Sequence, residues 1–188
     1  MKINQIFTLI FTFVVLTNCG DDNKELKFQE KDKEKIVLQR DILSEKYLKT
    51  VEFKNHLYSK FFDTISGKMT YEYESELWKN DKIIGGFIVS TFIYPKSDLN
   101  KMDEHFFNYL AGFNFGEFIS SGIRYQRTHK IELPFREYRI YETYKNDTLN
   151  MGLSFNVLKK NKIIFASVVT HDPFELEIKK LIDKLNKI

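Results

Sequence analysis

The sequence has little cysteine and little excess charge. Each shortage excludes or disfavours one class of protein. Cys19 is the one cysteine, so no intramolecular disulfide can form and the fold must be held by its core. The 29 basic and 26 acidic side chains give a net charge of +3 without a long basic block, which argues against nucleic acid as a partner. The core has ample material, because the chain contains 18 phenylalanines and 10 tyrosines.

The sequence also lacks the short motifs that mark many enzyme and metal sites. The four histidines are scattered, with no HExxH or similar metal-binding spacing; they are His56, His105, His129 and His171. Gly85 and Gly86 are not followed by the Lys-Ser or Lys-Thr pair of a phosphate-binding loop. Ser120 and Ser121 lack the preceding glycine of a nucleophile elbow. We therefore predict no catalytic residue, no metal ligand and no cofactor.

Long apolar runs are scarce as well. The run at residues 6–17 is too short to span a bilayer, which takes about 20 apolar residues, and it follows Lys2 as the h-region of a signal peptide does. At the end of this run, Leu16, Thr17, Asn18 and Cys19 resemble the lipobox of bacterial lipoproteins.

This resemblance implies that residues 1–18 are a lipoprotein signal peptide and that Cys19 becomes a lipid-bearing N-terminus. Acyl chains such as palmitate would then anchor the protein to a membrane. An uncleaved N-terminal anchor with an incidental cysteine is the alternative. Asp21 and Asp22 resemble the surface-export signal of some Gram-negative lipoproteins. The expected location is the bacterial cell envelope, in the outer membrane of a Gram-negative bacterium, facing the periplasm or the surface.

Residues 19–35 are predicted to be a charged flexible tether, because acids and bases alternate there with few apolar residues between them. A frayed helix is the alternative for the second half of this segment. Residues 36–188 have the length of one ordinary domain.

Periodicity predicts strands over much of this domain. Residues 67–78 alternate, which places apolar residues on a core face and three glutamates on a solvated face. The KNDK sequence at 79–82 turns the chain into an interior strand that is apolar on both faces. One or two strands are expected within 117–133. Residues 135–144, 149–158 and 162–170 should form an antiparallel meander.

Helical spacing predicts three helices. The first covers residues 36–48, and a central helix begins at Ser97 as its N-cap and ends near Gly112. The third is C-terminal, with Asp172 as N-cap and Pro173 at the first helical position. The class is therefore α+β, with a mainly antiparallel sheet packed by the central and the C-terminal helix.

The order of these elements resembles the Mog1/PsbP-like fold over roughly the last 120 residues. The resemblance rests on a central helix, a meander that ends in KNKIIFASVVT, and a terminal helix with the sequence DPFELEIKKLIDKL. Members of that family include small envelope lipoproteins and share no catalytic residues. The resemblance implies a non-enzymatic binding or assembly role.

Arginines and tyrosines interleave in the second half of the chain, and both residue types are favoured at interfaces. The set comprises Arg124, Arg127, Arg136, Arg139, Tyr125, Tyr138 and Tyr141. We predict that Arg124, Arg127, Arg139 and Tyr141 bind a protein partner, with Tyr138 on the opposite, inner face. A solvated sheet face is the alternative. The carboxylates of Glu72, Glu74 and Glu76 are the second candidate, because they could collect a cation or a basic partner.

The predicted function is that of a lipid-anchored cell-envelope protein, held to the membrane through Cys19, which serves as a non-enzymatic binding or assembly module for a protein partner. A membrane-tethered hydrolase, or another enzyme with an unrecognised site, is the alternative.

Overall fold

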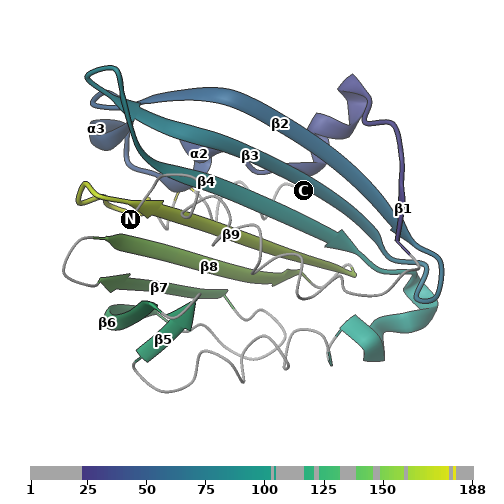
Figure 1. The fold of residues 1–188 in the computed structure, drawn as a ribbon. Helices are drawn as coiled ribbons and strands as arrows, with labels where there is room; N and C mark the ends of the chain where they lie inside the picture. The colour runs from purple at the N-terminus through teal and green to yellow at the C-terminus, as the bar shows by residue number, and fades with distance from the viewer. Residues whose placement is uncertain are drawn as a thin grey trace.

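The fold is built on one antiparallel sheet of nine strands with a few short helical segments, an α+β fold in which the sheet dominates (Figure 1). The computed structural model describes residues 23–102, 104, 117–120, 123–131, 139–145, 149–158, 161–177 and 180. The strand order is β1-β2-β3-β4-β9-β8-β7-β6-β5, and all neighbours are antiparallel. The predicted signal peptide and Cys19 lie outside the described residues.

The strands are β1 (Asn23–Glu25), β2 (Glu52–Asp63), β3 (Met69–Lys79), β4 (Lys82–Ile93), β5 (Glu117–Ser120), β6 (Ile123–Ile131), β7 (Arg139–Lys145), β8 (Asn150–Leu158) and β9 (Lys162–Thr170). The short helices are η1 (Glu30–Lys35), α2 (Gln39–Ile42), α3 (Glu45–Leu48) and η2 (Lys96–Asp98). None of the helices within these described segments is long and apolar enough to cross a membrane.

The β3–β4 hairpin forms as the sequence predicts. Asn80 and Asp81 have φ angles of 49° and 59°, in the left-handed region that Asn and Asp tolerate better than most residues. The chain can therefore reverse in two residues. β4 then lies between β3 and β9, which confirms the predicted interior strand. The meander of β7, β8 and β9 is also confirmed, and the region 117–133 contains two strands, β5 and β6.

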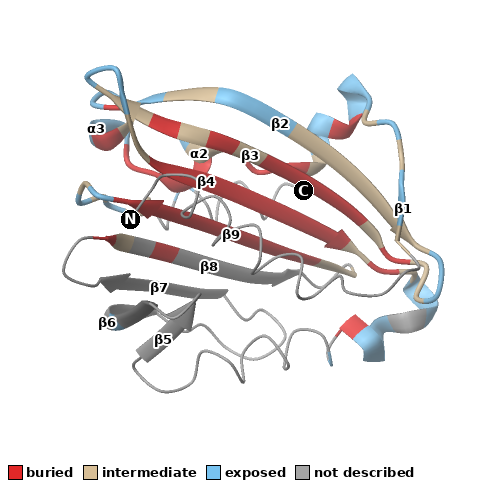
Figure 2. Cartoon of the chain, viewed as in Figure 1, coloured by how far each residue is buried: buried red, intermediate tan, exposed pale blue. Residues whose placement is uncertain are grey.

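The core lies between one face of the sheet and the segments that precede β2. Side chains of β3, β4 and β9 on this face are buried against residues 36–51; the largest are Tyr71, Tyr73, Leu77, Phe87, Val89, Ile164 and Val168. Figure 2 shows that β4 and β9 are buried along most of their length. Ile88, Phe92 and Phe165 on the other face are buried too, so these central strands are covered on both sides.

The first predicted helix is wrong as one element. Residues 36–48 contain two single-turn helices, α2 and α3, because Leu43 between them is extended, with φ −90° and ψ 150°. Asp41 accepts a hydrogen bond from the Leu38 amide at 2.9 Å, and Ser44 accepts one from the Tyr47 amide at 3.2 Å. Each short helix thus has its own N-terminal cap.

The predicted flexible tether is also wrong from Asn23 onward, whereas residues 19–22 lie outside the described part. β1 pairs with the last residues of β2, and η1 follows. Asp32 is only 4% exposed, and its carboxylate lies 3.1 Å from the Lys60 ammonium of β2. Burial raises the pKa of Asp32, but hydrogen bonds from the Gln29 amide and Lys60 outweigh this effect, and the pKa lies below its usual value. A long-range ion pair therefore anchors a segment whose composition suggests a solvated chain.

The C-terminal helix does not begin at Asp172 and Pro173. Residues 173–177 instead run beside α2, where the Ser44 amide donates to the Glu175 carbonyl at 3.0 Å and the Glu177 amide donates to the Ile42 carbonyl at 2.7 Å. The Asp172 carboxylate accepts a hydrogen bond from Lys79. These tertiary contacts replace the local capping pattern, and among the described residues beyond Thr170 the helix appears at Lys180.

The central helix begins later than predicted. Ser97 lies inside η2, and α-helical residues are described at 99–102 and at 104. Met102 is buried, as its place on the predicted apolar stripe requires. Gly112 lies outside the described residues.

We predict that Asp32→Asn lowers the free energy of unfolding by about 1 to 3 kcal/mol, because it leaves the partly buried Lys60 ammonium, whose side chain is 15% exposed, without its counter-charge. The measurement is urea unfolding of the chain that begins at Asn23. Glu30→Gln is the matched control, since the Glu30–Lys33 pair is exposed to solvent and should contribute little to stability. Equal unfolding midpoints for the two variants would show that residues 23–35 are not part of the cooperative fold.

Candidate binding surface

The predicted Arg and Tyr residues lie on two adjacent strands, yet they are spread along them. Arg127 of β6 is opposite Tyr144 of β7, and Tyr141 is opposite Ile131. Arg124 and Arg139 consequently lie at opposite ends of this strand pair, eight residue steps or about 27 Å apart along the strand axis. Arg136 and Tyr138 lie outside the described residues. The register thus separates Arg124 from Arg139 and places Arg127 and Tyr141 between them, and a binding role for these residues stays a prediction.

The three glutamates of β3 do not form the solvated ladder that alternation predicts. Glu72 is only 7% exposed, and its carboxylate accepts a hydrogen bond from the Ser90 hydroxyl at 3.3 Å. Burial, with a smaller effect from the charge of Glu74, raises the pKa of Glu72 to about 7. Burial raises the pKa of Glu74 as well. Alternation identified the face correctly, but at Glu72 this face of β3 is buried, and Glu74 and Glu76 are only partly exposed.

A buried lysine lies near Glu72. Lys68 is buried, with its ammonium 5.4 Å from the centre of the Phe92 ring and 4.0 Å from the Asp63 carboxylate. Burial lowers the pKa of Lys68. Within the described segments, no three His, Cys, Asp or Glu side chains are grouped so that they could hold a metal ion.

Glu76, the third glutamate, supports a bulge in β2. The pairing of β2 with β3 shifts between Lys54 and Leu57, and Asn55 within the bulge has a φ of 53°. The Glu76 carboxylate accepts hydrogen bonds from the Asn55 side-chain amide at 2.6 Å and from the Trp78 ring nitrogen at 2.8 Å. A side chain from β3 thus holds the bulge in place.

The bulge also directs His56 onto the core face of the sheet. The Nδ1 atom of His56 lies 2.9 Å from the Tyr73 hydroxyl, and the two rings stack with centroids 5.9 Å apart. The Tyr73 hydroxyl donates to the Gln39 side-chain oxygen at 3.0 Å, which links β3 to α2. Tyr73 is buried while His56 is exposed, so this pair connects the core to the surface.

Aromatic rings continue from this pair toward the N-terminal segment. Tyr58 of β2 lies between Tyr73, at a centroid distance of 5.0 Å, and Phe28, at 5.2 Å. The Lys33 ammonium lies 5.3 Å from the centre of the Tyr58 ring. Tyr58 is partly buried, and tyrosine is a residue type favoured at interface hot spots.

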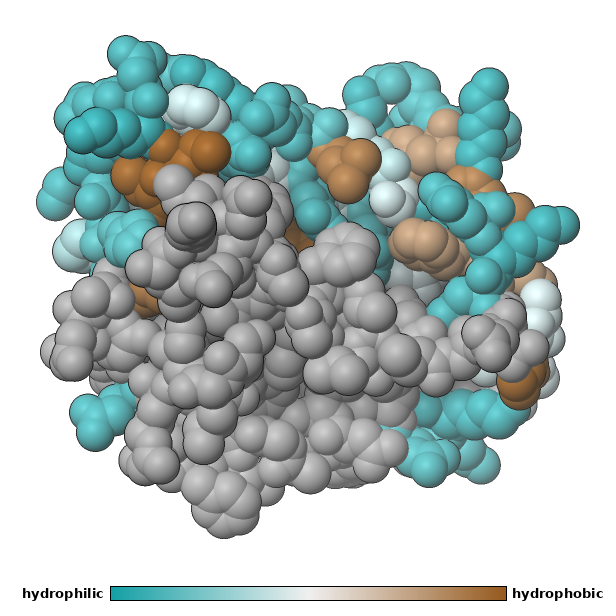
Figure 3. Space-filling view, viewed as in Figure 1, coloured by the Kyte–Doolittle hydropathy of each residue, from teal (hydrophilic) through white to brown (hydrophobic). Residues whose placement is uncertain are grey.

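The outer edge of β2 beside these rings is unpaired over residues 52–59, in that no described strand lies against it (Figure 1). β1 pairs with β2 at residues 61–63 only, and the Leu26 amide then donates to the Lys60 carbonyl at 2.8 Å. We call residues 52–59 the β2 edge. Leu57 on this edge is 53% exposed, and Figure 2 shows the exposed middle of β2 in pale blue. Hydrophilic side chains dominate the upper margin of the molecule around it (Figure 3).

The sequence reasoning did not identify the β2 edge or His56. Residues 51–62 have an ambiguous pattern, because the bulge puts the apolar residues out of alternation. Asn55 is a local signal for the bulge, since Asn is among the residues that best tolerate a positive φ.

We predict that Glu72 makes the protein less stable as the pH rises from about 4.5 to 7. The ordinary pKa is 4.5 and the folded value about 7, so in this window the folded state keeps a proton that the unfolded chain has lost. The resulting loss is about 3 kcal/mol and should be largely absent from Glu72→Gln.

The measurement is urea unfolding at pH 5 and pH 8. Glu52→Gln is the control, because Glu52 is exposed and its replacement should leave the pH dependence unchanged. If Glu72→Gln loses as much stability between the two pH values as the unaltered protein, the buried carboxyl does not carry this effect.

Comparison with known proteins assigns this chain to no family. No protein-family model matches the chain, and no curated protein and no solved structure matches it either.

Proposed function

We propose that the protein is a lipid-anchored cell-envelope protein that binds an extended segment of a protein partner along the β2 edge. It acts as a non-enzymatic binding or assembly module, anchored through Cys19 in the outer membrane of a Gram-negative bacterium, on the periplasmic or the surface side. The observation that carries the proposal is the stretch of β2, residues 52–59, against which no described strand lies, next to the partly buried aromatic pair Phe28 and Tyr58.

The β2 edge can accept a strand through its backbone. The Lys60 carbonyl points outward to the Leu26 amide, and alternation in an antiparallel strand makes the backbone groups of Tyr58 point outward too. A partner strand that hydrogen-bonds there extends the sheet by one strand. Leu57 and Tyr58 point to opposite faces and would contact alternate side chains of that partner, which gives selectivity.

The bulge at Asn55 restricts what can pair. A bulge twists an edge strand and interrupts its ladder, which protects against indiscriminate association with other edges. The β2 edge therefore suits a short segment that fits the bulge and disfavours an unlimited stack of copies.

The proposal includes a finer fold assignment, the resemblance to the Mog1/PsbP-like fold. Its support is the β7–β9 meander and the helical residues that follow β4, in the order on which the resemblance rests. The late start of the C-terminal helix departs from that pattern.

Glu72 is the observation that favours the alternative, a membrane-tethered hydrolase. A carboxyl with a pKa of about 7 suits general acid or base chemistry, and the Ser90 hydroxyl donates to it. Ser90 is fully buried and Glu72 nearly so, however, so the pair does not meet a substrate in this conformation. We therefore favour binding.

We predict that Leu57→Lys abolishes partner binding while the protein stays folded, because charged edge residues oppose strand addition and exposed substitutions usually change stability by less than about 0.5 kcal/mol. The measurements are recovery of crosslinked partner from the native envelope and slowed amide exchange at Tyr58 in the complex. Gln126→Lys is the matched control, since it also places a lysine at an exposed strand position, on β6 and away from both the β2 edge and the turn at Ile65. Equal recovery from both variants, with unprotected Tyr58, would exclude the β2 edge.

We also predict that Cys19→Ser leaves an unprocessed precursor that incorporates no fatty acid, because serine cannot form the thioether to lipid. Metabolic labelling with a radioactive fatty acid and the apparent mass of the protein test this. Normal labelling of Cys19→Ser would exclude the lipoprotein assignment.

A further inference from the structure

The turn between β2 and β3 is a rigid support for one exposed apolar side chain. The Asp63 carboxylate accepts hydrogen bonds from the Ile65 amide at 3.0 Å, the Ser66 amide at 3.1 Å and the Ser66 hydroxyl at 2.6 Å. Gly67 supplies the positive φ of 67° that closes the turn. Ile65 is 73% exposed at its tip. The turn thus presents an isoleucine to the surroundings in a fixed position.

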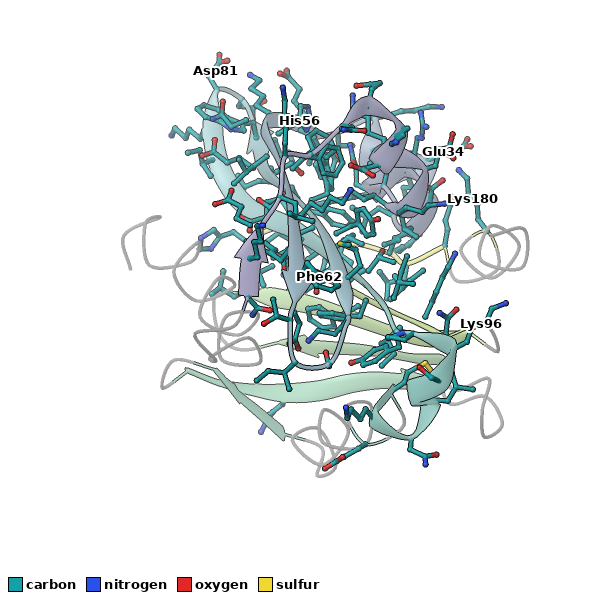
Figure 4. All side chains as sticks on the ribbon, turned by 90° about the vertical axis from the view of Figure 1, so that its right-hand side faces the viewer. Glu34, His56, Phe62, Asp81, Lys96 and Lys180 are labelled. Atoms are coloured by element: carbon teal, nitrogen blue, oxygen red, sulfur yellow. The ribbon has the colours of Figure 1, made fainter. Side chains whose placement is uncertain are left out.

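The segment after β4 lies against this turn. A Cβ atom on Gly67 would be 3.0 Å from Cγ of Pro95, so the two segments are in contact. Leu99 follows Pro95 by one helical turn and is 43% exposed, and Lys96 is exposed (Figure 4). We call this region, residues 64–68 and 95–101, the hairpin end. Two of the three large hydrophobic side chains that are exposed in the described structure, Ile65 and Leu99, lie here.

The chain reaches the fold at the same place. Asn23 is paired with Asp63, the residue at which the turn begins. Cys19 precedes Asn23 by four residues, which span at most about 14 Å when extended. A lipid on Cys19 would therefore hold the hairpin end close to the bilayer, and this step rests on the proposed lipidation.

Charged residues of both signs surround the hairpin end, and the exposed Lys96 adjoins Pro95, the residue in contact with the turn. Lys24, Lys96 and Lys101 are exposed there and Glu25 and Glu104 are exposed acids, while Asp98 ends η2 and Asp21 and Asp22 precede Asn23 in the sequence. The Asp63 carboxylate is engaged by the turn and by Lys68 and is not directed outward. Basic residues next to a membrane anchor are attracted to anionic headgroups, and apolar side chains beside them enter the interface.

We propose that the hairpin end is a second membrane contact, in which Ile65 and Leu99 insert into the lipid interface and Lys96 meets lipid phosphates. The bilayer is thus the occupant of this exposed apolar pair. The contact fixes the orientation of the sheet, with its strands directed away from the membrane. Leu57 of the β2 edge, six residues from Asp63, then stands about 20 Å above the hairpin end, free for a protein partner.

The test measures depth in the bilayer with tryptophan. Lipidated full-length protein carrying Ile65→Trp is reconstituted into vesicles of phosphatidylethanolamine and phosphatidylglycerol with brominated acyl chains, which quench tryptophan at short range. Fluorescence of Ile65→Trp should be lower in these vesicles than in unbrominated vesicles, because an interfacial side chain lies about 5 to 10 Å into the headgroup and acyl boundary, within reach of the bromines. Leu57→Trp is the matched control and should show no quenching. The native Trp78, near the far end of β3, gives a constant background in both.

Leu99→Trp is a second, independent probe and should be quenched as Ile65→Trp is. Adding Lys96→Glu to Ile65→Trp should reduce the quenching in these vesicles and have no effect in vesicles of phosphatidylcholine alone, because the attraction is to anionic headgroups.

The outcomes separate this inference from the proposed function. If the mass of the purified protein shows no lipid on Cys19, the lipid-anchor proposal fails. If the lipid is present but Ile65→Trp and Leu99→Trp are not quenched, or Leu57→Trp is quenched as strongly, the hairpin end does not contact the bilayer, and Ile65 and Leu99 then belong to a protein contact.

Discussion

The pairing of β4 with β9 is the contact on which the rest of the sheet depends, because it joins β1–β4 to β5–β9 through nine residue pairs. The two strands approach so closely at Gly85 that a Cβ atom there would lie 2.0 Å from the Val169 carbonyl oxygen. Only a residue without a side chain permits this approach. The glycine in an otherwise apolar strand, which has no role in a phosphate-binding loop, thus has a structural role.

Segments that are distant in sequence cover the sheet next to the paired strands β4 and β9. Phe28 and Asp32 cover and pair with β2, and residues 173–177 run beside α2. The Glu177 carboxylate accepts from the Glu45 amide at 2.9 Å and so satisfies the first turn of α3. The segment before β2 and the segment after β9 therefore cover the core face together. This cover holds in place the neighbouring rings of Phe28, Tyr58, Tyr73 and His56.

Much of the fold could be predicted because its signals are local. The Asn80–Asp81 turn and the alternation of β3 specify a hairpin by themselves, and the run of apolar residues in β4 requires an interior position. The errors arose where a distant residue decides the structure. Asp32 is buried because Lys60 is opposite, 28 residues away, and Asp172 caps no helix because its segment pairs with α2 and Lys79.

The candidate site was harder to predict than the fold for a related reason. Alternation assigned Glu72 to the correct face of β3, yet a sequence pattern gives no information on what covers that face. His56 could not be assigned to any face, since the bulge at Asn55 shifts the period by one residue. An unpaired edge is a property of the whole strand order, and so the β2 edge emerges only when every neighbour of β2 is known.

One strand, β2, connects the two proposed contacts, so the number of its residues sets the distance between them. The same strand begins at the β2 edge and ends, at Asp63, in the turn that carries Ile65. The number of β2 residues between the two contacts would therefore determine how far a bound partner lies from the lipid. Removing two residues from β2 between these points, with the matching two from β3, would lower the partner by about 7 Å and leave every remaining side chain on its original face. Evolution could therefore change the distance between the partner and the membrane two residues at a time, without altering the residues of either contact.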